Sequence, residues 1–213
     1  STGGGNIIVG NVSDKVEIST GGGEVKVASA MKNLEVSTGG GNITIGSIGG
    51  KAEISTGGGN ISVGSVSSGI EISTGGGNIK LDGANGSIDV STGGGNISLK
   101  NVKGSVDVST GSGNVELELD PIAGSLSEIS TGNGKITLYV SEKANVVINA
   151  NFLAGKYIES GKNPQVHLFS DFDGVSYDQN DSKGEMNATL KLNNGGSTIE
   201  LNVVSGEIFI KKK

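Results

Sequence analysis

The sequence predicts an all-β protein: a right-handed, single-stranded parallel β-helix (β-solenoid) with 18-residue coils and an irregular, β-rich C-terminal cap. Three observations predict this fold. The word STGGGN, or a close variant, begins at every eighteenth residue from Ser1 to Ser109 and once more, after 21 residues, at Ser130. Aliphatic residues, many of them β-branched, recur two apart within each repeat, which is strand spacing. No helical pattern of i, i+3 and i+4 survives in the first 138 residues.

Each repeat is expected to hold two short strands. In the first repeat, one strand carries Ile7 and Val9, and the other carries Val16 and Ile18. A unit of 18 residues cannot bury its own apolar side, so the units must stack at the strand spacing of about 4.8 Å, with like residues over like residues. The repeats therefore predict that residues 1–138 form about eight regular coils around one continuous core.

The repeated word is expected to form a corner between strands. Glycine permits positive φ there and lets successive corners stack without Cβ clashes. Asn at the sixth position, as in Asn42 and Asn60, tolerates left-handed geometry and is suited to a hydrogen-bonded ladder between coils. Ser and Thr are adjacent, so they face opposite sides of the strand. Thr38 and its equivalents are expected to close the core, which argues against an ice-binding face of paired Thr rows.

Two other solenoids fit the sequence less well. Eighteen residues equal three hexapeptides, the coil of left-handed β-helix acyltransferases, but apolar residues would then recur every six positions. Asn6, twelve residues before Ile18, breaks that pattern. The RTX calcium roll needs an Asp in each turn, where Asn stands in this chain. A right-handed coil also agrees with the general handedness of parallel crossovers.

The pattern changes near Tyr139, from which point all seven aromatic residues occur. We therefore divide the chain into regular repeats, 1–138, and degenerate coils with a C-terminal cap of the same solenoid, 139–213, including an excursion at about 152–187. SGEIFI near the C-terminus reads as a degenerate final repeat that helps to cover the core. The sequence begins within a repeat and without Met, so an upstream segment or a partner is expected to cover the first coil.

Charge and composition argue against several functions. The net charge is −6 and Arg is absent, so no nucleic-acid partner is expected, because phosphate recognition favours Arg. No apolar run approaches the roughly 20 residues of a transmembrane helix. Without Cys, neither a disulfide nor a thiolate metal site can form.

An acidic residue stands two positions before the Ser of each repeat, pointing outward by alternation. Like charges about 5 Å apart repel by about 0.8 kcal/mol in water. The column is either a solvated face that discourages lateral sheet association, or a strip for cations or a partner. Its members are Glu17, Glu35, Glu53, Glu71, Asp89, Asp107 and Glu128. The candidate metal ligands among them are Glu53, Glu71, Asp89 and Asp107.

A second candidate site combines aromatic and acidic residues in the C-terminal part. Exposed aromatic rings stack on sugars, and carboxylates bind Ca²⁺, the one cofactor considered for this chain. The candidate contact residues are Phe169, Phe172, Tyr177 and Tyr157, and the candidate Ca²⁺ ligands are Asp171 and Asp173. The segment DFDG matches only half of a calcium loop. The alternative is a hydrophobic cap with a polar loop.

The repeats, from STGGGNI to STGNGKI and the closing SGEIFI, resemble a family of bacterial adhesins with repeats of the type Ser/Thr-Gly-x-Gly-Asn/Asp-hydrophobic-x-hydrophobic. The family is otherwise catalogued as a domain of unknown function. The resemblance covers nearly the whole chain and implies a right-handed β-helix in an exported protein, at the cell surface or in the periplasm of a bacterium. It implies no catalytic residue.

We therefore expect a non-enzymatic envelope protein, an adhesin that presents a solenoid face to a glycan or a surface protein. One alternative is a scaffold that self-associates end to end, and the oligomeric state is left open. A further alternative is a polysaccharide-active β-helix enzyme. A hydrolase needs two carboxylates in a cleft, and a lyase usually needs an Arg or Lys base. His167, the only His, does not by itself make a triad.

Overall fold

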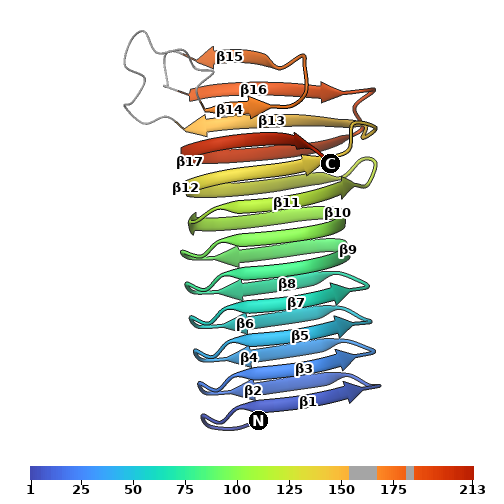
Figure 1. Cartoon of the computed structure of the whole chain (residues 1–213), viewed down its shortest axis with the longest axis vertical. Coiled ribbons are helices and arrows are strands. Elements are labelled where there is room, and N and C mark those ends of the chain that lie inside the picture. The colour runs from blue at the N-terminus through green and yellow to red at the C-terminus, as the bar shows by residue number, and fades with distance from the viewer. Residues whose placement is uncertain (154–166, 181–184) are drawn as a thin grey trace.

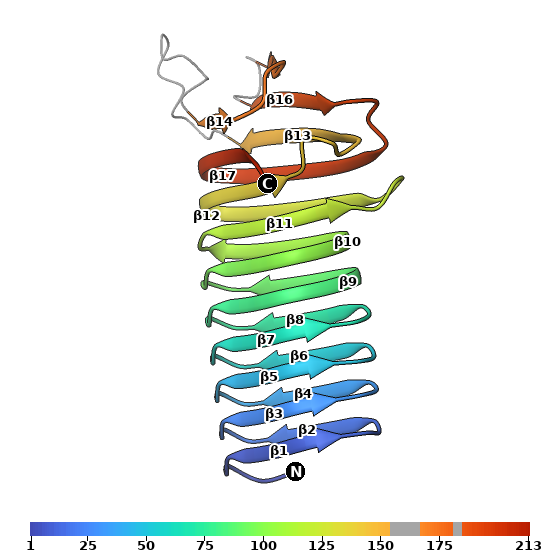
Figure 2. The same cartoon turned by 45° about the vertical axis from the view of Figure 1, so that its right-hand side comes forward.

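The computed structural model describes residues 1–153, 167–180 and 185–213. Its regular structure is β throughout these residues, in about seven stacked parallel coils of about 18 residues, which confirms the predicted β-solenoid. The coils rise from the N-terminal end to the C-terminal cap (Figures 1 and 2). The predicted count was about eight. The three-residue insertion before Ser130 does not interrupt the stack, because Ser130 still pairs with Ser109. Over the described residues, no helix has the length and hydropathy of a membrane span.

The strands follow the repeat. The first coils contain two separate strands each: β1 (Ile7–Val12), β2 (Val16–Thr20), β3 (Val25–Ala30), β4 (Leu34–Thr38), β5 (Ile43–Ile48), β6 (Ala52–Thr56), β7 (Ile61–Val66) and β8 (Ile70–Thr74). Three longer strands then run through both sides of a coil: β9 (Ile79–Thr92), β10 (Ile97–Ser112) and β12 (Leu126–Val140). The short strand β11 (Val115–Pro121) lies between β10 and β12. The C-terminal part contains β13 (Val146–Leu153), β14 (Leu168–Ser170), β15 (Ser176–Asn180), β16 (Glu185–Leu192) and β17 (Ser197–Lys212).

The coils form two parallel faces. In the first face, β1 pairs with β3, and Ile7 lies beside Val25. In the second face, β2 pairs with β4, and Val16 lies beside Leu34. Both pairings are offset by 18 residues, so each residue lies beside its equivalent in the next repeat.

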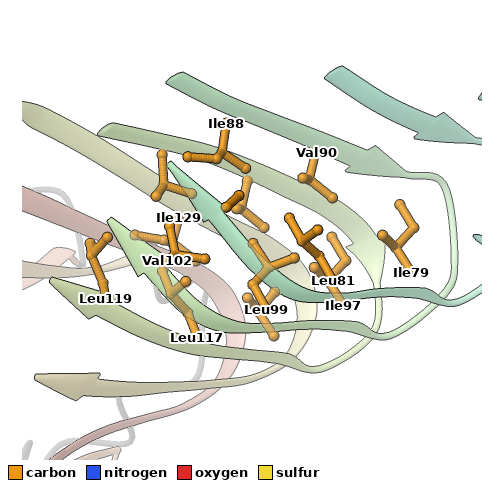
Figure 3. Packing of buried hydrophobic residues seen from close by; sticks show 14 of the residues in the cluster. Ile79, Leu81, Ile88, Val90, Ile97, Leu99, Val102, Leu117, Leu119 and Ile129 are labelled. Carbon is orange, nitrogen blue, oxygen red and sulfur yellow. The ribbon is translucent and has the colours of Figure 1, made fainter. Parts of the chain in front are cut away.

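The core lies between the two faces and consists of the predicted apolar columns. Ile79, Leu81, Ile88 and Val90 are all buried, and Figure 3 shows them packed with their equivalents from neighbouring coils. The Thr of the repeated word is also buried, as predicted. The hydroxyl of Thr38 donates a hydrogen bond to the backbone carbonyl of Gly23 at 3.0 Å, so this buried polar group has a partner.

The first and third glycines of the stacked corners are needed for stacking, as predicted, but not for left-handed geometry. A Cβ on Gly59 would lie 2.1 Å from the carbonyl oxygen of Gly41 in the coil below. Yet the glycines of the regular STGGGN corners do not adopt φ in the left-handed region. The predicted positive φ at these corners is therefore wrong: the distance between coils, rather than the local backbone angle, excludes a side chain.

The Asn residues of the corners form the predicted ladder without the predicted left-handed conformation. The Oδ1 atom of Asn60 accepts a hydrogen bond from the backbone N–H of Asn78, and Asn78 accepts one from Asn96, each at 2.8 Å. Among the described residues, the non-glycine positions with positive φ are Asn101 and Asn193, which lie outside this column. Each corner Asn thus ties its coil to the next.

The C-terminal part does not simply continue the stack in sequence order. The strand β17 pairs in parallel with β12, with Ile129 beside Leu201 and Leu138 beside Ile210, so β17 forms the coil directly after β12. Residues 141–196 are therefore an insertion between two consecutive coils, longer than the predicted excursion at about 152–187. The strands β13 and β14 pair in parallel with β17 on the edge opposite to β12 (Figure 1). The strand β16 then runs antiparallel to β13, and β15 runs antiparallel to β16.

Candidate functional site

Five of the sequence-predicted residues gather around one cavity of about 480 Å³ in the cap, which we call the cap pocket. They are Phe169, Phe172, Tyr177, Asp171 and Asp173. The cavity is also lined by Leu168, Ser170, Gly174, Val175, Phe209 and Lys211. Tyr157, the remaining predicted contact residue, lies outside the described residues.

The pairing of β14 with β17 builds the aromatic wall of the cap pocket. Phe169 lies directly beside Phe209, and both face outward because their neighbours Leu168 and Ile208 are buried. The two rings are stacked, with centroids 4.7 Å apart and planes 13° apart. Sequence reasoning missed Phe209, although the alternation in SGEIFI indicates an outward position for it.

The turn that carries the acidic residues is tied to β17. The backbone N–H of Asp171 donates to the carbonyl of Ile210 at 2.9 Å, and the backbone N–H of Lys212 donates to Oδ2 of Asp171 at 3.3 Å. The Ser170 hydroxyl lies 3.0 Å from both the N–H and the carbonyl oxygen of Phe172. These bonds fix the Asp171 carboxylate and the following residues at the mouth of the pocket.

The three predicted aromatic residues differ in exposure. Phe169 is 43 % exposed and Tyr177 is 37 % exposed, so both can meet a ligand. Phe172 is half-buried and packs against the hydrophobic core. Phe172 therefore fits the alternative interpretation, in which these aromatic residues build the hydrophobic cap. Phe169 and Tyr177 remain candidate contact residues.

Lysine side chains surround the aromatic rings. The ammonium group of Lys135 lies 4.7 Å from the centroid of Phe209, and that of Lys211 lies 5.8 Å from the same centroid. Lys212 lies 5.6 Å from the ring of Phe172. These are cation–π distances. The sequence did not single out these lysines, because cation–π contacts form between residues that only the pairing of strands brings together.

The lining of the cap pocket contains two carboxylates, those of Asp171 and Asp173. Ca²⁺ takes six to eight oxygen ligands, roughly, in proteins. Within the described parts of the chain, no three His, Cys, Asp or Glu side chains form a group that could hold a metal ion. Ca²⁺ binding by Asp171 and Asp173, or by the acidic column, stays a prediction.

The predicted acidic column lies on the second face, with its side chains in register and exposed. It has an eighth member, Glu200, which lies beside Glu128 because β17 follows β12. At this end of the column, Asn side chains donate hydrogen bonds to the carboxylates. Asn149 donates to Oε1 of Glu200 at 2.7 Å, and Asn202 donates to Oε1 of Glu128 at 3.0 Å. Sequence reasoning missed Glu200 because it lies outside the 18-residue spacing.

A groove of about 480 Å³ runs beside the acidic column. Its charged lining residues are Lys15, Glu35, Lys51, Glu53, Glu71 and Asp89. Asp107 and Glu128 line a neighbouring hollow of about 250 Å³. The structure therefore places Glu53, Glu71 and Asp89 along one groove and Asp107 beside it.

Partial burial, and then the neighbouring Asp107 carboxylate, raise the pKa of Asp89 above its ordinary value of 3.8. The folded protein thus binds this proton more tightly than the unfolded chain does. Ionised Asp89 lowers stability at neutral pH, and this loss disappears as the pH falls through the folded pKa towards 3.8. We expect Asp89→Asn to raise the free energy of unfolding at neutral pH, with no gain at about pH 3.

Urea unfolding of both proteins across this pH range measures the effect. The Asp107→Asn variant is the control, because removing the neighbouring charge should shrink the gain from Asp89→Asn. An equal gain at every pH would show that the effect of Asp89→Asn does not arise from ionisation.

A comparison with protein families places the chain in a family. A family model described as Toastrack DUF4097 matches residues 7–211. No curated protein and no solved structure matches the chain. The match agrees with the β-solenoid that the repeats predict, and it adds no activity, ligand or location. The adhesin role and export stay predictions.

Proposed function

The chain belongs to the Toastrack DUF4097 family, and we propose that it is a non-enzymatic binding protein of the bacterial envelope whose cap pocket contacts a glycan. The observation that carries this proposal is the convergence of exposed aromatic rings and two carboxylates on one cavity. Its volume of about 480 Å³ falls within the range of roughly 300–1,000 Å³ that is common for ligand sites.

The chemistry of the cap pocket suits a sugar. Pyranose rings present C–H groups that pack on aromatic faces, and Phe169 offers an exposed ring whose position is held by Phe209. Asp171 and Asp173 offer acceptors for sugar hydroxyl groups. The strands β14 and β17, which carry lining residues of the pocket, lie at the opposite end of the solenoid from the N-terminus (Figure 1), so the regular coils would act as a spacer.

Replacing Phe169 by Ala is expected to weaken glycan binding about tenfold or more, because a central aromatic contact contributes about 1.4 kcal/mol or more. The measurement is binding to an immobilised glycan array, followed by titration calorimetry on the glycans that bind. Ile122→Ala is the matched control, because it removes another exposed apolar side chain outside the pocket.

Phe172→Ala should also lower the melting temperature, since Phe172 packs against the core, whereas Phe169→Ala should change it little. Unchanged affinity in Phe169→Ala, or an array on which the wild-type protein binds no glycan, would overturn the proposal.

The envelope location is tested separately on intact cells. If the protein is displayed at the surface, added protease should cleave it on whole cells, and antibody against the regular coils should detect the loss. Protection until the envelope is broken, with cleavage afterwards, would contradict surface display and favour a periplasmic or internal role. A cytoplasmic marker protein that stays intact controls for lysis.

A further inference from the structure

We propose that the cap pocket selects an uncharged sugar, with one flat C–H face, over uronic acids, amino sugars and phosphorylated glycans. This inference rests on the proposed function and names its ligand class. It follows from three features of the pocket: its aromatic wall, the two signs of charge in its lining, and the ion pairs of two lysines next to its rings.

The aromatic wall sets the shape of the ligand. Phe169 and Phe209 stack at 4.7 Å in neighbouring strands, so Phe209 supports one face of Phe169, and the exposed part of the Phe169 ring is left for a ligand. Burial of C–H groups on such a surface is favourable for a sugar ring that keeps its hydroxyl groups at the edge. Tyr177, which is also exposed, adds a further ring with a hydroxyl group to the lining.

The polar lining sets the charge of the ligand. Asp171 and Asp173 carry negative charge, and Lys211 carries positive charge in the same cavity. A charged sugar of either sign meets a like charge as well as an opposite one there, so its net electrostatic gain is small, whereas a neutral hydroxyl group can donate to a carboxylate and accept from an ammonium group. Asp171 accepts the backbone N–H of Lys212 at 3.3 Å, and its carboxylate retains further acceptor positions.

Two lysines next to the aromatic rings are in ion pairs. The ammonium group of Lys212 lies 2.7 Å from Oε1 of Glu142, and that of Lys135 lies 3.4 Å from Oε2 of Glu207. Each pair offsets the positive charge of its lysine. Lys135 and Lys212 therefore do not turn the pocket into a general anion site, and Lys211 is the lysine that lines it.

Both segments of the cap are needed for this specificity. Asp171, Asp173 and Phe169 come from the insertion at 141–196, whereas Phe209 and Lys211 come from the coil formed by β17. The pocket exists only where these segments meet. Lys211 is thus a specificity residue that the sequence did not indicate.

The test uses oligosaccharides of equal length in neutral, uronate and amino-sugar forms, each in gluco and galacto configurations. Titration calorimetry with the full chain should show a neutral oligosaccharide binding about tenfold or more tightly than its charged counterparts. Its affinity should change by less than about twofold between about 0.05 M and about 0.5 M NaCl, because no net charge is paired on binding.

Two charge variants sharpen the test. Lys211→Glu should shift the preference towards the amino sugar, and Asp173→Asn should shift it towards the uronate. Phe169→Ala should weaken the binding of every form. If a charged form binds as tightly as the neutral one, the inference on charge is wrong while glycan binding stands. If neither these sugars nor a broad glycan array show any binding, the proposed function fails with it.

Discussion

Replacing Gly59 by Ala is expected to destabilise the solenoid by about 3 kcal/mol, because the added Cβ would overlap the backbone of the coil below. It would lie 2.1 Å from the carbonyl oxygen of Gly41, 2.5 Å from its carbonyl carbon and 2.8 Å from the backbone nitrogen of Asn42. All three atoms are backbone, so no side chain can move aside to relieve the overlap. The two coils would have to separate locally, which weakens the hydrogen bonds between them.

Gly58 is the matched control in the same corner. A Cβ at Gly58 would meet no atom within 4 Å, and this glycine is not in the left-handed region. Gly58→Ala should therefore change stability little, or raise it by about 0.5 kcal/mol by restricting the unfolded chain. Thermal and urea unfolding followed by far-ultraviolet circular dichroism compares the two variants. Equal stability of both would show that the corners are not held at the spacing described.

Removal of β17 is expected to unfold the cap, although β17 is the last strand of the chain. It lies between β12 and β13 and buries apolar side chains on both faces, including Ile199, Leu201 and Ile208. Truncation after Gly196 takes away the strand on which β13 and β14 pack. Hydrogen exchange should lose protection in β13 and β16, while β1 to β10 keep it, because solenoid coils depend mainly on their neighbours.

By contrast, the solenoid should still fold when the insertion at 141–196 is removed, although this insertion is much longer than β17. In β9, the corner Asn85-Gly86-Ser87 joins Ala84 to Ile88. Replacing residues 141–197 by Asn-Gly would leave Thr198 in place. Val140 would then be joined to Ile199 by the three residues Asn-Gly-Thr, which is the length of the corner in β9.

We expect a folded, shorter solenoid with cooperative unfolding and with no glycan binding, since the insertion carries most of the cap pocket. An unfolded internal deletion, or a C-terminal truncation whose cap stays protected, would contradict the placement of β17 directly after β12.

Much of the candidate site could be predicted from composition and alternation. Aromatic and acidic residues concentrate in one segment of the sequence, and five of them line the cap pocket. Phe209 and Lys211 were not predicted as partners, since they lie about 40 residues further along the chain. They reach the pocket because Phe209 pairs with Phe169 across β14 and β17.

The sequence by itself determined the coil, because its information is local and repeated. A period of 18 residues, alternation by two and a Gly-rich corner specify which side chains face the core, and the columns through Ile43 and Ile54 are buried accordingly. The outward acidic column follows from the same alternation. Only the tertiary structure decided which coil lies beside which once the period ended. The neighbour of Ile129 is Leu201, 72 residues away, and such a pairing depends on which buried surfaces and strand edges fit together rather than on a local signal.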